Sequence, residues 1–389
     1  MNSKKLQILY CQLFGFFYVL YCIGIGYVNI YLTGRGLQPG SIGLITALFG
    51  AAAALVQPVL GRIADKSRIF HWKTLLLLLF GLCLAFYMMQ VFFHAGYISG
   101  LTCGMILLLL NAITPFINGA VFYYQKNGYK VDFGSARGCG SLMYSLSSLL
   151  LGQCVARLGV QIITTAGIIF SVVLLLIVWR MPYMGEKTCE DAIAKESVRK
   201  GFARKYPRFL CMFAGAVFLL MFHNMTSTYM LQMMEQVGGG SAETGILFAI
   251  AGILEIPVMF SIVPLIRKFG SGNLLVVAGV AFFIKSVIYT VASSVAVLYA
   301  AQILQMFSYA LLASVSVFFS DEIMDAEDKL KGQALVGSAI TCGGVLGNLA
   351  GGVILQYLGL DAMLWIALMM AGVGMITILM MRFLKWKKS

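Results

Sequence analysis

Three titratable side chains lie inside long apolar segments, where ionised groups are costly. Glu255 stands in the run Ile253-Leu-Glu-Ile-Pro257 and is the only carboxylate far from both ends of its segment, while Lys285 and His223 lie inside two others. A charged residue at membrane depth costs about 2.5–3.5 kcal/mol on insertion scales and is a functional candidate by default. Apolar surroundings favour the neutral form of a carboxyl group, as a proton carrier requires. We therefore expect Glu255 to carry a coupling proton, with His223 and Lys285 as its partners.

A structural role remains open for the same residues. Glu255 and Lys285 would tolerate each other at membrane depth as a static ion pair, because each neutralises the other. His223 is of the one residue type that titrates near neutral pH without perturbation. A single histidine serves equally well as a neutral hydrogen-bond donor in a packed core.

A polar stripe follows one face of a further apolar segment. Arg137, Ser141, Tyr144 and Ser148 recur at i, i+4, i+7 and i+11, which is helical spacing. The planar guanidinium of Arg137 can bind adjacent hydroxyls with two parallel hydrogen bonds, and Tyr144 offers an aromatic face to sugar C–H groups. The alternative is that Arg137 extends towards the cytoplasmic surface and binds nothing.

Polar and aromatic residues on other segments would complete a substrate site. Asn118 continues the stripe of Asn111 and Pro115, and two tyrosines near the start of the chain offer hydroxyls, although such aromatic residues also serve as packing. The expected substrate-binding residues are Asn118, Arg137, Ser141, Tyr144, Tyr18, Tyr21, Asn224 and Gln305. Their amides and hydroxyls suit a small polyhydroxylated solute, and a nucleoside suits them nearly as well as a sugar.

Twelve long apolar segments must position these side chains. The segments lie at roughly 8–32, 40–62, 72–93, 98–124, 136–157, 160–182, 208–235, 241–265, 272–292, 295–321, 331–357 and 360–384. A helix needs about 20 residues to cross roughly 30 Å of hydrocarbon. Helices are required because lipid offers no partner to backbone N–H and C=O groups. The sequence thus predicts an all-α membrane protein with twelve transmembrane helices.

Positive charge is sorted to one side of the predicted membrane. Counting residues at the adjoining segment ends, all Lys and Arg residues except Arg35, Arg157 and Lys285 fall at the chain ends or around the connections after even-numbered segments. The positive-inside rule places this side, with both termini, in the cytoplasm. The net charge of +13 follows from this sorting, and no basic run interleaved with aromatics points to nucleic acid.

The chain divides into two similar halves. Residues 183–207 form a polar, basic linker, which separates a six-helix bundle at 1–182 from a second at 208–389. Gly36 and Gly43 open the second segment with the same spacing as Gly238 and Gly245 at the eighth. Repeated halves around a central site are typical of alternating-access carriers. The alternative is that any two membrane helices look alike.

Other function classes find little support in the sequence. The nine cysteines are scattered, with no CxxC or Cys/His spacing, so we expect neither a disulfide nor a metal site. The catalytic motifs of metalloproteases, P-loop enzymes and serine hydrolases are absent, and the longest connection is too short for a catalytic domain. We expect no enzyme and no cofactor, apart from a proton as coupling ion.

Two sets of residues resemble a known family. Gly61-x-x-x-Asp65-Lys66 after the second segment is similar to the loop motif of the major facilitator superfamily, in which this loop latches one state of the carrier. Segments 56–61, 111–115, 132–137, 263–266, 285–289 and 304–307 resemble the branch of lactose permease, the oligosaccharide:proton symporters and the related nucleoside:proton symporters. The resemblance implies two pseudo-symmetric six-helix bundles. The alternative for the loop is an ordinary positive-inside connection.

The resemblance also assigns site residues, with departures. Arg137 matches the family's sugar-binding arginine and Tyr144 its stacking aromatic, whereas Asn118 replaces a glutamate and cannot pair with Arg137 as an ion. Gln305 and Ser308 stand where the family has its coupling histidine and glutamate. Galactoside specificity and the family's proton route therefore do not carry over.

These expectations combine into one functional hypothesis. We expect a monomeric symporter in a bacterial inner or plasma membrane that takes up a sugar, oligosaccharide or nucleoside with protons. An uncoupled facilitator or a proton-driven exporter of another small organic solute is the alternative. A receptor or scaffold on the same fold would need no titratable residue at mid-membrane, and Glu255 argues against it.

Overall fold

The computed structural model describes residues 2–66, 71–93, 96–183, 202–325 and 327–384. In the first half, the helices are α1 (Ser3–Tyr21), the π-helical turn η1 (Cys22–Gly26), α2 (Val28–Gly34), α3 (Pro39–Lys66), α4 (Trp72–Phe92), α5 (Gly96–Lys126), α6 (Phe133–Leu158) and α7 (Gln161–Arg180). In the second, they are α8 (Phe202–Lys205), α9 (Pro207–Thr228), α10 (Met230–Gln236), α11 (Ser241–Phe269), α12 (Ser271–Thr290), α13 (Val295–Ala301), the 3₁₀ turn η2 (Gln302–Gln305), α14 (Tyr309–Ile323) and α15 (Lys329–Met380). The described residues form helices and no strand.

Eleven helical stretches of the described chain are long and apolar enough to span a membrane. The last, Lys331–Met380, contains a break at Gly359, whose φ of 85° lies in the left-handed region. Glycine adopts this conformation without a steric penalty, so α15 comprises two consecutive helices. The architecture is consistent with the twelve predicted spans and confirms the all-α membrane class.

Three spans are interrupted, and the first and seventh spans are interrupted at equivalent places. The first span leaves α-helical geometry at η1 and Tyr27, where φ is −104° and ψ is 9°. The seventh is interrupted at Tyr229, where φ is −101° and ψ is 26°. The tenth span is interrupted at η2, which carries Gln302 and Gln305. These breaks turn side chains out of the register that an unbroken helix would give them.

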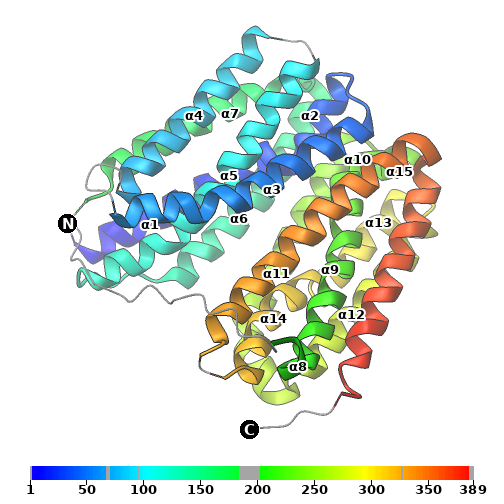
Figure 1. Cartoon of the computed structure of the whole chain (residues 1–389). Helices are drawn as coiled ribbons and strands as arrows, with labels where there is room; N and C mark the ends of the chain where they lie inside the picture. The colour runs from blue at the N-terminus through cyan, green and yellow to red at the C-terminus, as the bar shows by residue number, and fades with distance from the viewer. Residues whose placement is uncertain (1, 67–70, 94–95, 184–201, 326, 385–389) are drawn as a thin grey trace.

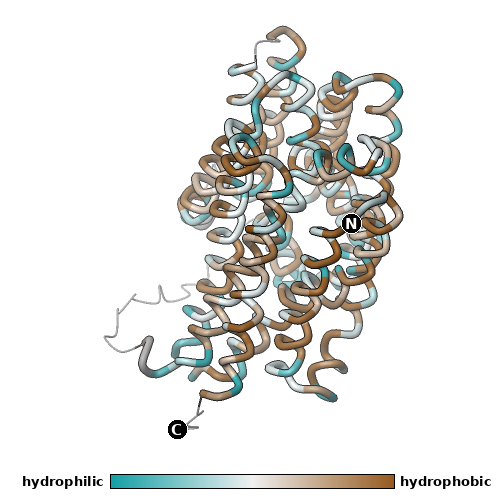
Figure 2. The backbone as a smooth tube through the Cα atoms, turned by 90° about the vertical axis from the view of Figure 1, so that its right-hand side faces the viewer, coloured by the Kyte–Doolittle hydropathy of each residue, from teal (hydrophilic) through white to brown (hydrophobic). Residues whose placement is uncertain are grey.

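Each half has its own apolar core. One buried cluster contains residues of the first half from Leu6 to Met181, with Leu231 added, and the other runs from Tyr206 to Met381. Large apolar side chains such as Leu55, Phe122 and Trp179 are exposed on the outer surface, and apolar residues dominate most of the length of the helices (Figure 2). Such a surface suits lipid rather than water.

The halves meet at one end and diverge at the other. They approach around α2 and α10 and separate towards the end where both chain termini lie (Figure 1). At the closed end, Asn29 Nδ2 donates to Gln232 Oε1 at 2.7 Å, and the Gly40 N–H donates to Gln356 Oε1 at 3.0 Å. The site between the halves is therefore sealed from the side of α2 and α10.

Candidate functional site

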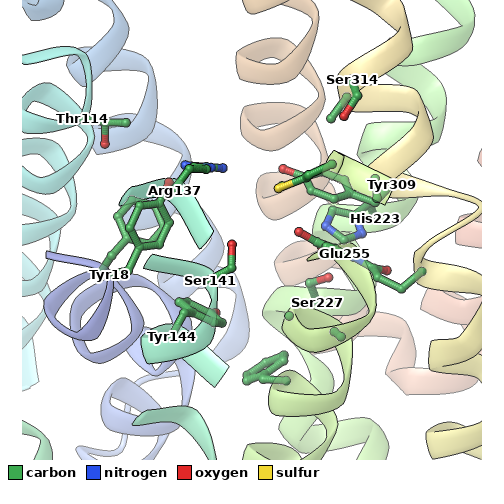
Figure 3. A pocket seen from close by; sticks show the side chains of 18 residues that line it. Tyr18, Thr114, Arg137, Ser141, Tyr144, His223, Ser227, Glu255, Tyr309 and Ser314 are labelled. Carbon is green, nitrogen blue, oxygen red and sulfur yellow. The ribbon is translucent and has the colours of Figure 1, made fainter. Parts of the chain in front are cut away.

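A cavity of about 350 Å³ lies between the two halves. Its lining comes from α1, α5 and α6 on one side and from α9, α11, η2 and α14 on the other (Figure 3). The lining residues are Tyr18, Tyr21, Thr114, Arg137, Ser141, Tyr144, His223, Ser227, Phe248, Ala251, Gly252, Glu255, Met259, Gln305, Tyr309, Ala310, Ala313 and Ser314. The volume falls within the roughly 300–1,000 Å³ of small-molecule sites.

Arg137 supplies the positive charge of the first wall. Asp132 caps α6, because its carboxylate accepts from the backbone N–H groups of Gly134 and Ser135, and Arg137 follows in the second turn. Its guanidinium carbon lies 4.9 Å from the centroid of the Tyr18 ring, and the side chain points into the cavity (Figure 3). Among the described residues, the guanidinium has no hydrogen-bond or ion-pair partner.

Aromatic residues form much of the rest of this wall. The Tyr18 and Tyr21 rings lie 5.8 Å apart between centroids, and the Tyr21 hydroxyl donates to Asn111 Oδ1 at 3.4 Å. Tyr144 lies one turn beyond Ser141 on α6, and both line the cavity. This wall offers aromatic faces and hydroxyls around one cation.

The opposite wall holds a bridged pair of charged side chains. Gln305 Nε2 donates to Glu255 Oε1 at 2.9 Å, and Gln305 Oε1 accepts from Lys285 Nζ at 2.6 Å. Gln305 is 4% exposed and Lys285 3%. The alternative of a direct static ion pair between Glu255 and Lys285 does not describe this arrangement, because the Gln305 amide lies between them. The amide orientation satisfies both neighbours, since its oxygen faces the cation and its nitrogen the carboxylate.

Lys285 lies behind this wall rather than in it. Its ammonium also donates to Gln302 Oε1 at 3.2 Å and lies 5.3 Å from the Tyr289 ring centroid. Gln302 in turn donates to the Tyr289 hydroxyl. These contacts satisfy the charge on Lys285 without the cavity.

His223 stacks against Tyr309 in the same wall. Their ring centroids are 4.3 Å apart and the planes are 17° from parallel, and both face the cavity near Glu255 (Figure 3). Ser227 adds a hydroxyl one turn along α9. Histidine, carboxylate and amide thus share one polar surface.

Two expected substrate residues lie elsewhere. Asn118 does not line the cavity, although Thr114, one turn earlier on α5, does. Asn224 is also absent from the lining, because its side chain packs against Gly344 and Gly347 of α15 and donates to the Leu220 carbonyl at 2.8 Å. The stripe from Arg137 is likewise split: Ser148 leaves the cavity and donates to the Gly245 carbonyl at 3.1 Å.

The loop motif is described only in part. Gly61 is half-buried on α3, and a Cβ added there would meet no neighbouring element within 4 Å. Asp65 and Lys66 belong to the end of α3, but their side chains lie outside the described residues.

Sequence reasoning missed several lining residues. Tyr309 follows η2, and the geometry of that break rather than any sequence spacing aims it at His223. Thr114 and Ser227 had a usable signal, because each lies at helical spacing from a residue of interest, Thr114 from Asn118 and Ser227 from His223. Within the described part of the chain, no group of three metal-ligating side chains is found.

Comparisons with known proteins agree with this architecture. A model of the MFS_1 like family matches residues 6–366. The uncharacterized transporter YwbF of Bacillus subtilis (strain 168) is 24% identical over 400 residues, covering 98% of this chain and 96% of that protein.

Solved structures share the fold at low identity. The nucleoside transporter NupG superposes with a TM-score of 0.82 at 15% identity, covering 98% of this chain and 99% of NupG. An auto-inhibited peptide transporter of the POT family gives 0.74 at 12% identity and covers 96% of each chain. With the polar cavity between two helical halves, these matches identify the chain as a member of the MFS_1 like family and a membrane transporter of the major facilitator type rather than an enzyme.

Proposed function

We propose that this chain is a monomeric, proton-coupled symporter that takes up a small polyhydroxylated solute such as a sugar or a nucleoside. Glu255 carries the proposal. It is the acidic side chain in the cavity wall, and the Gln305 amide holds it opposite the substrate-binding wall of Arg137 and Tyr18. Such a carboxylate can sense both the bound solute and the proton, which a symporter requires.

The lining supports a solute rich in hydroxyl groups. Ser141, Ser227 and Thr114 offer hydroxyls, while Tyr18 and Tyr144 offer ring faces. The fold neighbour NupG is a nucleoside transporter, and ribose needs the same donors and acceptors as a hexose. Each half of the chain supplies one wall, so a single copy completes the site.

The coupling scheme follows from the cost of charge in a closed cavity. When the carboxylate of Glu255 is ionised, it accepts a hydrogen bond from Gln305. Protonation removes that charge, so closing the cavity around solute desolvates one ion fewer. Loss of the proton on the cytoplasmic side then disfavours closure with the solute still bound and promotes release.

The distribution of positive charge gives the direction of transport. Under the positive-inside assignment the termini and the linker are cytoplasmic, and the membrane is a bacterial plasma membrane. The state described here, closed near α2 and α10, then opens to the cytoplasm. Uptake ends in this state.

Paired transport assays in proteoliposomes test the proposal. Wild type should take up protons when solute is added under de-energised conditions. Glu255→Gln, permanently neutral, should lose accumulation driven by a pH gradient and keep solute exchange. The exposed Glu235→Gln is the matched control and should behave as wild type.

The alternatives predict other results. An uncoupled facilitator moves no protons in wild type. A proton-driven exporter accumulates solute only when the pH gradient has the opposite orientation. If Glu255 has a structural role only, Glu255→Gln should impair every transport mode, and Lys285→Gln added to it should restore part of the loss. Accumulation that survives in Glu255→Gln would refute the coupling role.

A further inference from the structure

The charges at the cavity do not balance. Arg137 lines it, Lys285 lies directly behind it, and Glu255 is the acidic residue among the described lining. Glu255 is already hydrogen-bonded to the Gln305 amide, and Lys285 has acceptors in Gln302 and Gln305. Among the described charged side chains at the cavity, Arg137 is therefore the cation left without a hydrogen-bond acceptor.

The first half of the chain cannot supply an anion for Arg137. Residues 1–182 contain two acidic residues, Asp65 and Asp132, and both lie at helix ends. Asp132 is occupied, because its two carboxylate oxygens accept from the N–H groups of Gly134 and Ser135. Asn118, on the neighbouring helix, carries no charge.

The surroundings of Arg137 leave its donors exposed to the cavity. Tyr18 contacts the guanidinium through a cation–π interaction, and the guanidinium points into the cavity (Figure 3). A guanidinium has five N–H donors in a planar fork that matches a carboxylate with two parallel hydrogen bonds. A desolvated charge without acceptors is costly, and an anion on the solute supplies the strongest acceptor for this guanidinium.

We propose that the transported solute is a small polyhydroxylated monocarboxylate, of the sugar-acid type, whose carboxylate pairs with Arg137. This inference rests on the proposed symport function and narrows its substrate class. A single free guanidinium suits a single negative charge. A phosphate ester would need a second cation, and Lys285 is unavailable because Gln305 separates it from the cavity. The hydroxyls of the solute meet Ser141, Ser227 and the tyrosines.

Matched solutes test the charge preference. Thermal stabilisation of the purified full-length protein is measured with D-glucuronate against D-glucose, D-gluconate against sorbitol, and uridine 5′-carboxylate against uridine. At least one carboxylate should bind about ten- to a hundredfold more tightly than its neutral partner, as expected for a charge-assisted hydrogen-bond pair. Equal or better binding of every neutral partner, or no stabilisation by any carboxylate, would overturn the inference.

Substitutions of Arg137 test whether this residue is responsible for the preference for a carboxylate. Arg137→Gln should abolish the difference within a pair, whereas Arg137→Lys should retain part of it because charge remains without the planar fork. Arg157→Gln changes an exposed arginine on the same helix and should leave the preference intact. If Arg137→Gln does not fold, an unchanged preference in Arg137→Lys still contradicts bidentate recognition, and a reduced one supports it.

Voltage separates this inference from the symport proposal. A monocarboxylate moving with one proton carries no net charge, so a potassium-diffusion potential should not change its uptake, while a pH gradient should drive it. Proton-driven, voltage-sensitive uptake of a neutral sugar keeps the symport proposal and overturns the monocarboxylate. Carboxylate uptake without proton movement keeps the monocarboxylate and overturns symport.

Discussion

Tyr27 and Tyr229 occupy equivalent places in the two halves, and each hydroxyl lies over a close crossing of two helices. The Tyr27 hydroxyl donates to the Ser148 carbonyl at 2.6 Å, and the Tyr229 hydroxyl lies 3.0 Å from the Asn348 carbonyl oxygen and 3.3 Å from that of Pro39. The two tyrosines share the offset of Gly43 and Gly245 along the chain. The two helix crossings at the closed end therefore repeat the same arrangement, one in relation to each half.

Glycines make these crossings. A Cβ added to Gly43 would lie 2.4 Å from the Asn348 carbonyl oxygen, and one added to Gly245 would lie 2.9 Å from the Cα of Gly152. No real side chain tolerates such distances, so both crossings close only with glycine.

Gly43→Ala should therefore open this end of the transporter. Overpacking of this kind costs about 1–3 kcal/mol, which would lower the population of the closed arrangement roughly five- to 150-fold. Asn29 is 3% exposed and bonds Gln232 at the same closed end, so a cysteine at position 29 should react faster with maleimide in the Gly43→Ala protein. Gly50→Ala on the same helix is the control, because its Cβ meets nothing within 4 Å. Equal labelling rates in the two variants would contradict the prediction.

An ion-pair cluster ties the start of the second half to the α14–α15 connection, and it should weaken at low pH. Lys205 Nζ lies 2.7 Å from Asp325 Oδ2 and 2.9 Å from Asp328 Oδ2. Lys205 lowers the pKa of both aspartates. The pKa of Lys205 is raised in turn, chiefly by Asp325. The aspartate contribution to stability is present above the unfolded pKa of 3.8 and is lost as pH falls through the lower folded value. The lysine contribution is lost only above 10.5.

Unfolding measurements at different pH values check this loss of stability at low pH. Asp328→Asn should destabilise the protein at pH 7, and the difference from wild type should shrink near pH 3 and in about 1 M salt, where exposed pairs are screened. In a Lys205→Gln background the same substitution should have a much smaller effect. A difference that is independent of pH and salt would show that the ion pair with Lys205 does not account for the effect, and would leave the hydrogen bond from the Tyr206 hydroxyl and packing as its source.

The fold was accessible from the sequence because hydrocarbon imposes length and composition on every span. The apolar segments and the spacing of Gly36, Gly43, Gly238 and Gly245 predict two repeated helical halves. The boundary between the last two spans is not a loop, because α15 continues through both spans and is broken only at Gly359. Glycine conformation, and not polarity, marks that boundary.

The site was accessible only where a helix is regular. On the unbroken α6, spacing alone brings Arg137, Ser141 and Tyr144 to one cavity wall. At η2 the helix is broken, and spacing does not show that Gln305 links Lys285 to Glu255. Asn224 illustrates a second limit, because the small residues of α15 that let it pack away from the cavity are distant in sequence.

Topology can be checked without a substrate. Positive charge predicts that the connection after α10 faces outwards and the end of α3 faces the cytoplasm. Cysteines at the exposed positions Glu235 and Arg62 report these two places. An impermeant maleimide should label position 235 in intact cells and position 62 only after lysis. The reverse pattern would invert the orientation and with it the proposed direction of uptake.

The bridge through Gln305 should make its neighbours energetically dependent on one another. Gln305→Leu removes the acceptor nearest to Lys285 Nζ and the donor to Glu255. A buried group left without its partner costs about 1–3 kcal/mol, and more when it is charged. The single variant should therefore lower the free energy of unfolding in mixed micelles.

A double-mutant cycle distinguishes the bridge from ordinary packing. Once Lys285→Met has removed the ammonium, Gln305→Leu no longer leaves it short of an acceptor, so the two losses should fall short of additivity by about 0.5–3 kcal/mol. Gln90 is the matched control: it is 1% exposed, lies in the other half and bonds Thr102 and Thr164 there. Gln90→Leu and Gln305→Leu should add within about 0.5 kcal/mol. Additivity of Gln305→Leu with Lys285→Met would mean that the bridge contributes nothing to stability. Any role of Gln305 in proton coupling would then act through Glu255 alone.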